Sequence, residues 1–356
     1  MVKGAPLSSP PTDPVELLGR LTEAAGPSGH EQEVRAIVRA EAARTGADVR
    51  VDRMGNVIAR KGRPGAAKVM LAAHMDEVAL LVVAVEKNGL LRFRPVGGVD
   101  PRLLVAKTVV VGDARVPGVI GAKPVHLQER DEQEKPISLD QLYIDVGAGS
   151  REEAERVVHA GDYAVFTTRF ARLGAGLLKG KALDDRAGCT VLLGALAADY
   201  DDVDVHAVFT VQEEVGTRGA TVAAYDIGPD WGMALEGTIC SDTPGSEAHA
   251  EATRLGAGPA ISIMDATSIP DRGMVRTLVR LADQHGLPHQ YRRTTAGGND
   301  AGRIQLTHAG VPSCSLSVPC RYIHSPVSLA SASDLAATTS LLVLFLNEIA
   351  RGGLRS

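Results

Sequence analysis

The sequence changes its pattern along the chain, and this change limits the possible folds more than any other feature. From about Leu173 onward, apolar strand-like runs alternate with amphipathic helical runs, which predicts a parallel or mixed sheet covered by helices on both faces. Between about Leu80 and Arg169, short β-type runs alternate with turn residues, and Asn88-Gly89 predicts a hairpin with a type I′ turn. The pattern therefore predicts an α/β fold that a small β-rich segment interrupts.

The amino-terminal part of the chain belongs, by the same pattern, with the later α/β region. Ser28 and Glu31 have the spacing of a capping box, which predicts a helix start, and a long apolar run then leads into the β-rich segment. We therefore predict a discontinuous α/β domain made of residues 1–79 and 170–356. Residues 80–169 are predicted to form an inserted β-rich domain.

The composition excludes several classes of partner. The 356 residues are 44% hydrophobic and carry a formal net charge of -5, which is typical of an ordinary globular protein. The sequence contains no concentrated basic patch, so we expect neither nucleic acid nor a membrane as a partner. The apolar run 341–346 is too short to span a bilayer. Four cysteines without a CxxC pair, and an amino terminus without the apolar core of a signal peptide, predict a reduced cytoplasmic protein.

Histidines and acids lie where the apolar runs end. In sheets of this kind, sites form beyond the carboxyl ends of the strands, so side chains at these ends are expected to meet. Imidazole and carboxylate groups are the ligands that zinc and neighbouring divalent metals accept. The residues at these element ends are His74, Asp76, Asp184, Asp185, Glu213, Glu214, Glu236 and His324.

Taken singly, these residues also fit ordinary structural roles. Glu213 and Glu214 are compatible with a solvated strand edge, and the aspartates at 184–185 with a helix start, where acids are favoured. His74 and Asp76 carry more information, because the i, i+2 spacing puts both side chains on one side of a strand. A carboxylate placed there can accept the second ring N–H and orient an imidazole that binds a metal.

Seven motifs together resemble the dinuclear metallo-aminopeptidases that assemble as tetrahedral particles. Members of this family carry the names glutamyl aminopeptidase and leucyl aminopeptidase and, in older labels, endoglucanase or cellulase M. The motifs occur in the order of the family and, with PSGHEQEVR at 27–35, cover most of the chain. They are AAHMDEV, GVIGAKPVHL, GKALDDRAG, QEEVGTRGA, ALEGTICSDTPG, AGGNDAG and YIHSPVS.

The resemblance implies a fold of the zinc-exopeptidase type and a site that holds two divalent metal ions. Zinc or cobalt is expected, with manganese as an alternative. By the resemblance, Asp184 bridges both ions. His74 and Glu236 complete one centre. Glu214 and His324 complete the other.

The resemblance also implies two catalytic roles outside the ligand set. Glu213 is the expected general base, and Asp76 is expected to orient His74. The chemistry is consistent with this, because amide hydrolysis at neutral pH needs a nucleophile stronger than water, and a metal lowers the pKa of bound water to about 7. The sequence departs from the family at Asn299, where a threonine is expected, so Asp300 is left without a role.

The function implied by the resemblance is an aminopeptidase that removes amino-terminal residues from peptides. The inserted domain would then join subunits in pairs, and twelve subunits would enclose a chamber. Three alternatives stay open: a deacylase or amidase of the same fold that acts on small N-acyl substrates, a glycoside hydrolase, and an assembly without enzyme activity. A glycosidase needs two acids that flank a glycosidic bond, and a metal set rich in histidine is poor support for it.

Overall fold

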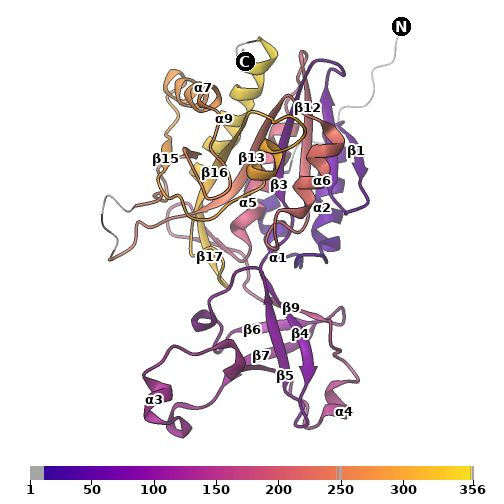
Figure 1. Cartoon of the computed structure of the whole chain (residues 1–356), viewed down its shortest axis with the longest axis vertical. Coiled ribbons are helices and arrows are strands. Elements are labelled where there is room, and N and C mark those ends of the chain that lie inside the picture. The colour runs from indigo at the N-terminus through magenta and orange to yellow at the C-terminus, as the bar shows by residue number, and fades with distance from the viewer. Residues whose placement is uncertain (1–11, 246, 248–250, 353, 355–356) are drawn as a thin grey trace.

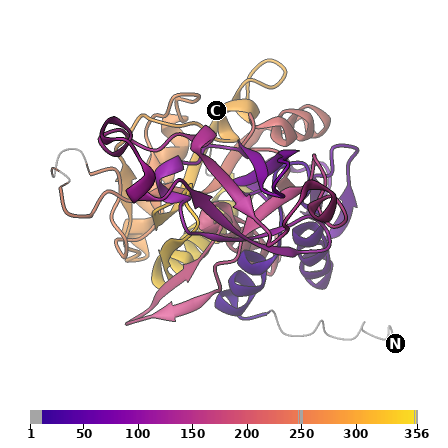
Figure 2. The same ribbon diagram turned by 90° about the horizontal axis from the view of Figure 1, so that it is seen from below.

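The computed structural model describes residues 12–245, 247, 251–352 and 354, and it has two bodies joined at a narrow waist (Figure 1). The upper body, which we call the host domain, holds a mixed sheet between helices. The lower body is a closed β-barrel, and the view from below places it in front of the host domain (Figure 2). The predicted fold class, a mixed sheet covered by helices with an inserted β-rich domain, is confirmed.

The host sheet is organised around parallel strands at its centre. Its strands in sheet order are β1 (Asp48–Val51), β2 (Val57–Gly62), β12 (Val203–Thr210), β3 (Ala67–His74), β13 (Trp231–Ile239), β16 (Ser313–Arg321), β17 (Ser328–Ser331), β11 (Leu177–Gly180) and β10 (Ala171–Leu173). Beside this row, β14 (Ala260–Ser262) pairs with β16, and β15 (Gln290–Arg292) pairs with β14. Strands β12, β3, β13 and β16 run parallel to one another, and β2 and β17 flank them in the antiparallel direction. The carboxyl ends of the parallel strands therefore lie along one edge.

Helices cover both faces of this sheet, and the alternation of side chains along β3 divides the core between them. Val69, Leu71 and Ala73 point into the larger core, whereas Met70 and Ala72 point into the smaller one. The larger core is covered by α1 (Pro14–Glu23), α2 (Gln32–Arg44), α5 (Leu183–Leu196), α7 (Arg272–Gln284) and α9 (Ala332–Ala350), and the smaller one by α6 (Arg218–Ile227) and α8 (Ala301–Gln305).

The barrel has its own apolar core, which includes Leu80, Phe93 and Ile144. It closes in the order β4 (Ala79–Val85), β5 (Leu91–Val96), β8 (Leu142–Asp145), β7 (Val116–Ala122), β6 (Thr108–Val111) and β9 (Tyr163–Phe166), and it carries the short helices α3 (Arg130–Gln133) and α4 (Arg151–Ala154). Strands β4 and β9 pair with each other, with Leu80 opposite Ala164. The chain therefore enters and leaves the barrel along neighbouring strands.

Two local predictions from the sequence are wrong. In the hairpin between β4 and β5, the Gly89 N–H donates to Glu86 O and the Glu86 N–H donates to Leu90 O, and of the Asn88-Gly89 pair Gly89 takes the positive φ. This is a longer turn than the predicted type I′ turn, which needs a positive φ at both residues.

The predicted capping box at the start of α2 does not form either. Glu31 takes the cap position without a side-chain cap bond, and the Ser28 hydroxyl donates to Asp76 Oδ2 at 2.6 Å. A hydrogen bond to an ionised carboxylate is stronger than one between neutral groups, so the Ser28 hydroxyl bonds to Asp76 and not to the backbone of α2.

Helix α9 contains the apolar run 341–346. Among the described residues, it is the one helix long and apolar enough to cross a membrane by length and composition. Half of its apolar window is buried in the host domain, and it packs against α5 and α7. Leu341, Leu342 and Phe345 are fully buried. In this structure α9 is a core helix of the host domain.

Candidate metal centre

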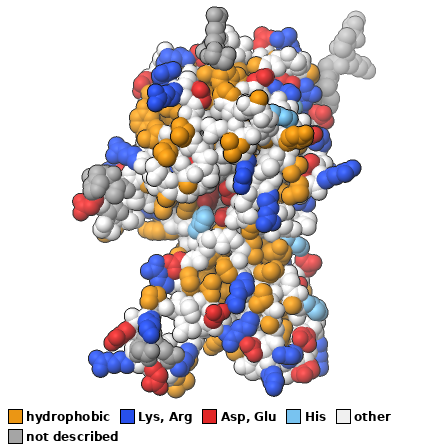
Figure 3. All heavy atoms as spheres, viewed as in Figure 1, with side chains coloured by type: hydrophobic (Ala, Val, Ile, Leu, Met, Phe, Trp, Pro, Cys, Tyr) orange, Lys and Arg blue, Asp and Glu red, His pale blue; other side chains and the backbone are white. Residues whose placement is uncertain are grey.

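The carboxyl ends of the parallel strands bring the predicted site residues to one place. His74 is the last residue of β3 and pairs with Thr210, the last residue of β12. Glu213 and Glu214 follow β12 in the next turn, and Glu236 lies near the end of β13. In the space-filling view, acidic and histidine side chains gather in the hollow at the waist between the two bodies (Figure 3). The site therefore lies between the host domain and the barrel.

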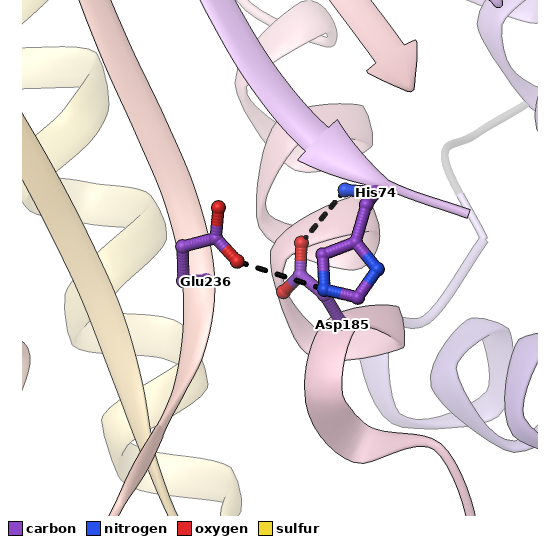
Figure 4. A group of neighbouring side chains, drawn as sticks. All are labelled: His74, Asp185 and Glu236. Atoms are coloured by element: carbon purple, nitrogen blue, oxygen red, sulfur yellow. Dashed lines mark hydrogen bonds and ion pairs between the residues drawn. The ribbon is translucent and has the colours of Figure 1, made fainter. Parts of the chain in front are cut away.

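His74 is enclosed by the protein, with a side chain that is 2% exposed. Its Nε2 lies 3.6 Å from Glu236 Oε2, and its backbone N–H donates to Asp185 Oδ2 at 3.0 Å (Figure 4). The other oxygen of Asp185 accepts the Gly188 N–H at 2.9 Å. His74, Asp185 and Glu236 each offer one possible metal-ligand atom, and these three atoms lie within 4.8 Å of one another.

Asp184 lies between the two histidines that were predicted to belong to different centres. Its Oδ1 is 3.3 Å from His74 Nε2, and its Oδ2 is 3.6 Å from His324 Nε2. A carboxylate with one oxygen toward each imidazole has the arrangement that a bridging ligand needs.

His324 and Glu214 form the more open part of the site. The His324 Nε2 atom is 3.7 Å from Glu214 Oε2, and the His324 side chain is 42% exposed, compared with 4% for Glu214. The second ring nitrogen of His324, Nδ1, is 3.0 Å from the carbonyl oxygen of Gly98. Gly98 follows β5 of the barrel, so the inserted domain contacts the site directly.

Asp76 holds the turn that carries the two glutamates. Its Oδ1 accepts the Glu213 N–H at 2.9 Å, and its Oδ2 accepts the Glu214 N–H at 3.1 Å and the Ser28 hydroxyl at 2.6 Å. The His74 Nδ1 atom is nearer to the backbone oxygen of Asp76, at 3.1 Å, than to its carboxylate, at 3.5 Å. The residue thus orients His74 mainly through its main chain and uses its carboxylate on the glutamate turn.

The acids of the site are crowded and poorly solvated. Burial raises the pKa of Glu213 and of Glu236 well above the usual range, and neighbouring carboxylates add to both shifts. Burial likewise raises the pKa of Glu214 to about 7 and that of Asp300 to about 6. Bound cations relieve such a concentration of carboxylates, because an ion is then the largest local charge.

Burial acts on the two histidines in the opposite direction, because it lowers the pKa of an imidazole, but the neighbouring carboxylates outweigh it. Burial opposes protonation of His74, but the Asp184 and Asp76 carboxylates raise its pKa well above the usual value. Hydrogen bonding to Asp184 raises the pKa of His324 to about 9, against the effect of burial. Burial works against ionisation of Asp184 as well, yet its bonds to His324 and His74 lower its pKa below the usual range.

The donor set fits divalent metal ions. Within the described chain, Glu236 Oε1 and Asp300 Oδ1 are buried side-chain oxygens without a hydrogen-bond partner. Buried polar atoms are nearly always paired, so an orphaned carboxylate oxygen at this place fits a cation as its partner. Two imidazoles and several carboxylates are ligands that zinc and its neighbours accept.

Sequence reasoning did not give Asp185 a role, although it lies next to Asp184. Both of its oxygens accept backbone N–H groups, and burial raises its pKa well above the usual range. The adjacent aspartates were the available signal, but the sequence does not say which of the two faces His74. The contacts of Ser28 and Gly98 with the site were also missed.

A buried ion cluster lies beside the site. Lys181 Nζ donates to both oxygens of Glu77 at 2.7 Å and to Ala24 O at 2.9 Å, and the Arg186 guanidinium lies 3.2 Å from Glu77 Oε1. All three charged side chains are at most 4% exposed. The cluster ties the turn after α1 to the start of α5, where Asp184 and Asp185 lie.

Comparison with known proteins identifies a family with the same motifs. The family model described as M42 glutamyl aminopeptidase matches residues 55–341. A putative aminopeptidase of Acetivibrio thermocellus is 40% identical over 332 residues, which cover 93% of this chain and 98% of that protein. A lysyl aminopeptidase of Pyrococcus furiosus is 35% identical across 94% of this chain and 97% of its own length. A glutamyl aminopeptidase of Lactococcus lactis is 30% identical across 92% and 94%.

Solved structures with this fold point in the same direction. An aminopeptidase of the archaeon Desulfurococcus kamchatkensis matches with a TM-score of 0.90 at 41% identity and covers 94% of both chains. The TET1 peptidase of Pyrococcus horikoshii, described as able to assemble into a tetrahedron or a large octahedral shell, matches with a TM-score of 0.84 at 35% identity, over 94% of this chain and 99% of that one. A Thermotoga maritima protein described as an endoglucanase matches with a TM-score of 0.77 at 34% identity, with the same coverage.

Proposed function

The chain belongs to the M42 glutamyl aminopeptidase family and is a metallopeptidase of the aminopeptidase type, and from this premise we propose that it works through a pair of divalent metal ions. The observation that carries this proposal is the placement of Asp184 between His74 and His324. Each imidazole also has its own glutamate, Glu236 beside His74 and Glu214 beside His324. These five residues are the proposed ligand set.

Bound divalent metals lower the pKa of water and polarise the carbonyl of the bond to be cut. In our proposal, Glu213 accepts the proton of the attacking water and returns it to the leaving amine. Its backbone N–H donates to Asp76, which fixes the main chain at this residue. Glu213 is half-buried, so a bound substrate can contact its carboxylate. Proton transfer by such a group typically contributes about 10² to 10⁴ in rate.

We propose peptides with a free amino terminus as the substrates. Carboxylates gather with the histidines at the site, and a positively charged terminal amine complements them. The relatives are named for different residues, lysyl in one and glutamyl in the other, so the residue that this enzyme prefers must be measured with a panel of aminoacyl substrates.

We place the enzyme in the cytoplasm, because its four cysteines are all buried and free. They are Cys189, Cys240, Cys314 and Cys320.

Adjacent, chemically identical residues provide the test of the mechanism. Glu213→Gln is expected to keep both metal ions and to lose about 10² to 10⁴ in kcat, because an amide cannot carry the proton. Glu214→Gln is expected to lose metal from one centre. Metal content by elemental analysis, together with kcat on an aminoacyl substrate, separates the two results.

Each result has a defined opposite. Substantial turnover by Glu213→Gln would remove its role as base, and full metal occupancy in Glu214→Gln would remove that residue from the ligand set.

We also propose that this chain assembles as a dodecamer, as the TET1 peptidase of Pyrococcus horikoshii does. Light scattering on the metal-loaded protein measures the mass of the assembly directly.

A further inference from the structure

The inserted barrel reaches the candidate metal centre through two glycines. Gly97 and Gly98 follow strand β5, and the carbonyl oxygen of Gly98 lies 3.0 Å from His324 Nδ1. A carbonyl oxygen can only accept a hydrogen bond, so the ring proton must be on Nδ1 when this bond forms. The lone pair of His324 is then on Nε2, which faces Asp184 and Glu214 at 3.6 and 3.7 Å. The contact therefore selects the tautomer that a metal needs.

The same two residues are packed so tightly against the site that a side chain at either position would force a neighbouring group to move. A β-carbon on Gly98 would lie 3.1 Å from His324 Nδ1. A β-carbon on Gly97 would lie 3.2 Å from both Cβ and Oε2 of Glu214 and 2.9 Å from Val78 Cγ1, and Gly97 has a φ of +80°. Both the close approach and the positive φ are conditions that glycine meets without strain. The glycine pair thus contacts both groups that we assign to one metal centre.

We propose that Gly97 and Gly98 are positioning residues of the metal centre formed by His324 and Glu214, so that this metal is held jointly by the barrel and the host domain. In the other centre, the backbone oxygen of Asp76 orients His74. Asp76 lies between β3 and the barrel in the chain, but its carboxylate contacts the host domain at Glu213. The proposal rests on the proposed function, because it takes the ligand set from there. It adds that a change in the barrel loosens one metal and leaves the other in place.

The test is a cobalt titration of the metal-free, full-length protein, followed by the visible absorbance of Co²⁺. His324→Ala identifies the binding phase that belongs to its centre. Gly98→Ala keeps the carbonyl but adds a β-carbon 3.1 Å from His324 Nδ1, so the ring must move away from its partner. It is expected to weaken that same phase by about 10- to 100-fold, the usual cost of disturbing a partner of a metal ligand, and to leave the other phase unchanged. Gly97→Ala is expected to act on the same phase through Glu214.

The barrel offers a matched control for each variant. Gly149→Ala adds a β-carbon that meets Glu153 at an ordinary 3.5 Å, and it controls for Gly98→Ala. Gly147 has the same φ of +80° as Gly97, and a β-carbon there meets nothing within 4 Å, so Gly147→Ala isolates the cost of the backbone conformation. Both controls should titrate like the wild type.

The outcomes separate the inference from the function on which it rests. If His324→Ala keeps both phases, the ligand set is wrong and the proposed function fails. If His324→Ala loses one phase while Gly98→Ala titrates like Gly149→Ala, the positioning role alone is overturned. Loss of both phases in Gly98→Ala also overturns it, because a general folding defect does not select one centre. Circular dichroism of the metal-free variants shows whether each one is folded.

Discussion

The two halves of the metal centre use the same device in different surroundings. In the inner half, His74 and Glu236, the imidazole is 2% exposed and its Nδ1 lies 3.1 Å from the backbone oxygen of Asp76. In the outer half, His324 and Glu214, the imidazole is 42% exposed and its Nδ1 lies 3.0 Å from the backbone oxygen of Gly98. One half is supported from within the turn that follows its own strand, and the other by a different domain. The same ring geometry therefore rests on a local turn in one half and on a contact between domains in the other.

The inner half is also backed by the buried cluster of Lys181, Glu77 and Arg186. Glu77 accepts the backbone N–H of Gly26 at 2.9 Å in addition to its contacts with both cations. Burial lowers the pKa of Lys181, and Glu77 opposes that shift. We expect this cluster to set the stability of the inner half, whereas the outer half depends on the contact between domains.

The largest effect is expected from Glu77→Gln. Glu77 is the anion that both buried cations contact, and removal of one partner from a buried ion pair costs about 3–5 kcal/mol of unfolding free energy. The matched control is Glu86→Gln, which breaks the exposed pair with Arg92 and is expected to cost about 0.2–1 kcal/mol. Urea denaturation of the metal-free variants measures both values. Equal losses at the two positions would show that the cluster adds no special support to the inner half.

A smaller effect, shared by both halves, is expected from Asp76→Asn. The amide keeps one acceptor oxygen and turns the other into an NH2 donor, whereas both oxygens of the carboxylate accept, from the Glu213 and Glu214 N–H groups and the Ser28 hydroxyl. Metal affinity is expected to fall by about 10- to 100-fold, or about 1.4–2.7 kcal/mol, at both centres. Isothermal titration with zinc measures this change, and Asp145→Asn, at the exposed end of β8 in the barrel, is the control. A loss at one centre alone would separate the halves more completely than we infer.

The smallest effect is expected from Tyr163→Phe. The Tyr163 hydroxyl of the barrel donates to Ser28 O at 2.9 Å, and Ser28 in turn contacts Asp76, which supports the inner half. Loss of one neutral hydrogen bond costs about 0.5–1.5 kcal/mol of unfolding free energy. Tyr143→Phe is the control, since that hydroxyl contacts Ala122 O within the barrel at 3.4 Å. A change in metal affinity as large as that of Gly98→Ala would contradict the view that the barrel supports the outer half more strongly.

The sequence predicted the fold well where periodic patterns carry the information. Alternation of strand and helix predicted the host sheet, and dense turn residues predicted a β-rich insert, because both patterns reflect which faces are buried. The limits of that insert at residues 80 and 169 stay a prediction. The turn at Asn88-Gly89 was predicted wrongly, since one positive φ is compatible with several turn types.

For the site, the sequence indicated which side chains meet and not how they are held. His74 ends β3, Glu236 lies toward the end of β13 and Glu214 follows β12, so their common edge could be inferred from the strand pattern alone. The support from Gly98 comes from a backbone carbonyl, which every residue has, and a pair of glycines by itself indicates a turn. The destination of the Ser28 hydroxyl depends on Asp76, a residue far away in the chain, and local capping rules gave the wrong partner.

The pairing of β4 with β9 has a consequence for how this architecture can change during evolution. Because the two strands are neighbours, the host domain carries the whole barrel as the loop of a single hairpin. The entropy of closing a loop grows slowly, by about 0.6 kcal/mol for each doubling of length, so such a position tolerates the gain or replacement of an entire domain. The bond between His324 and Gly98 limits that freedom. A new insert can join the same two points of the host domain at little entropic cost, but it must also bring a carbonyl oxygen to the His324 imidazole.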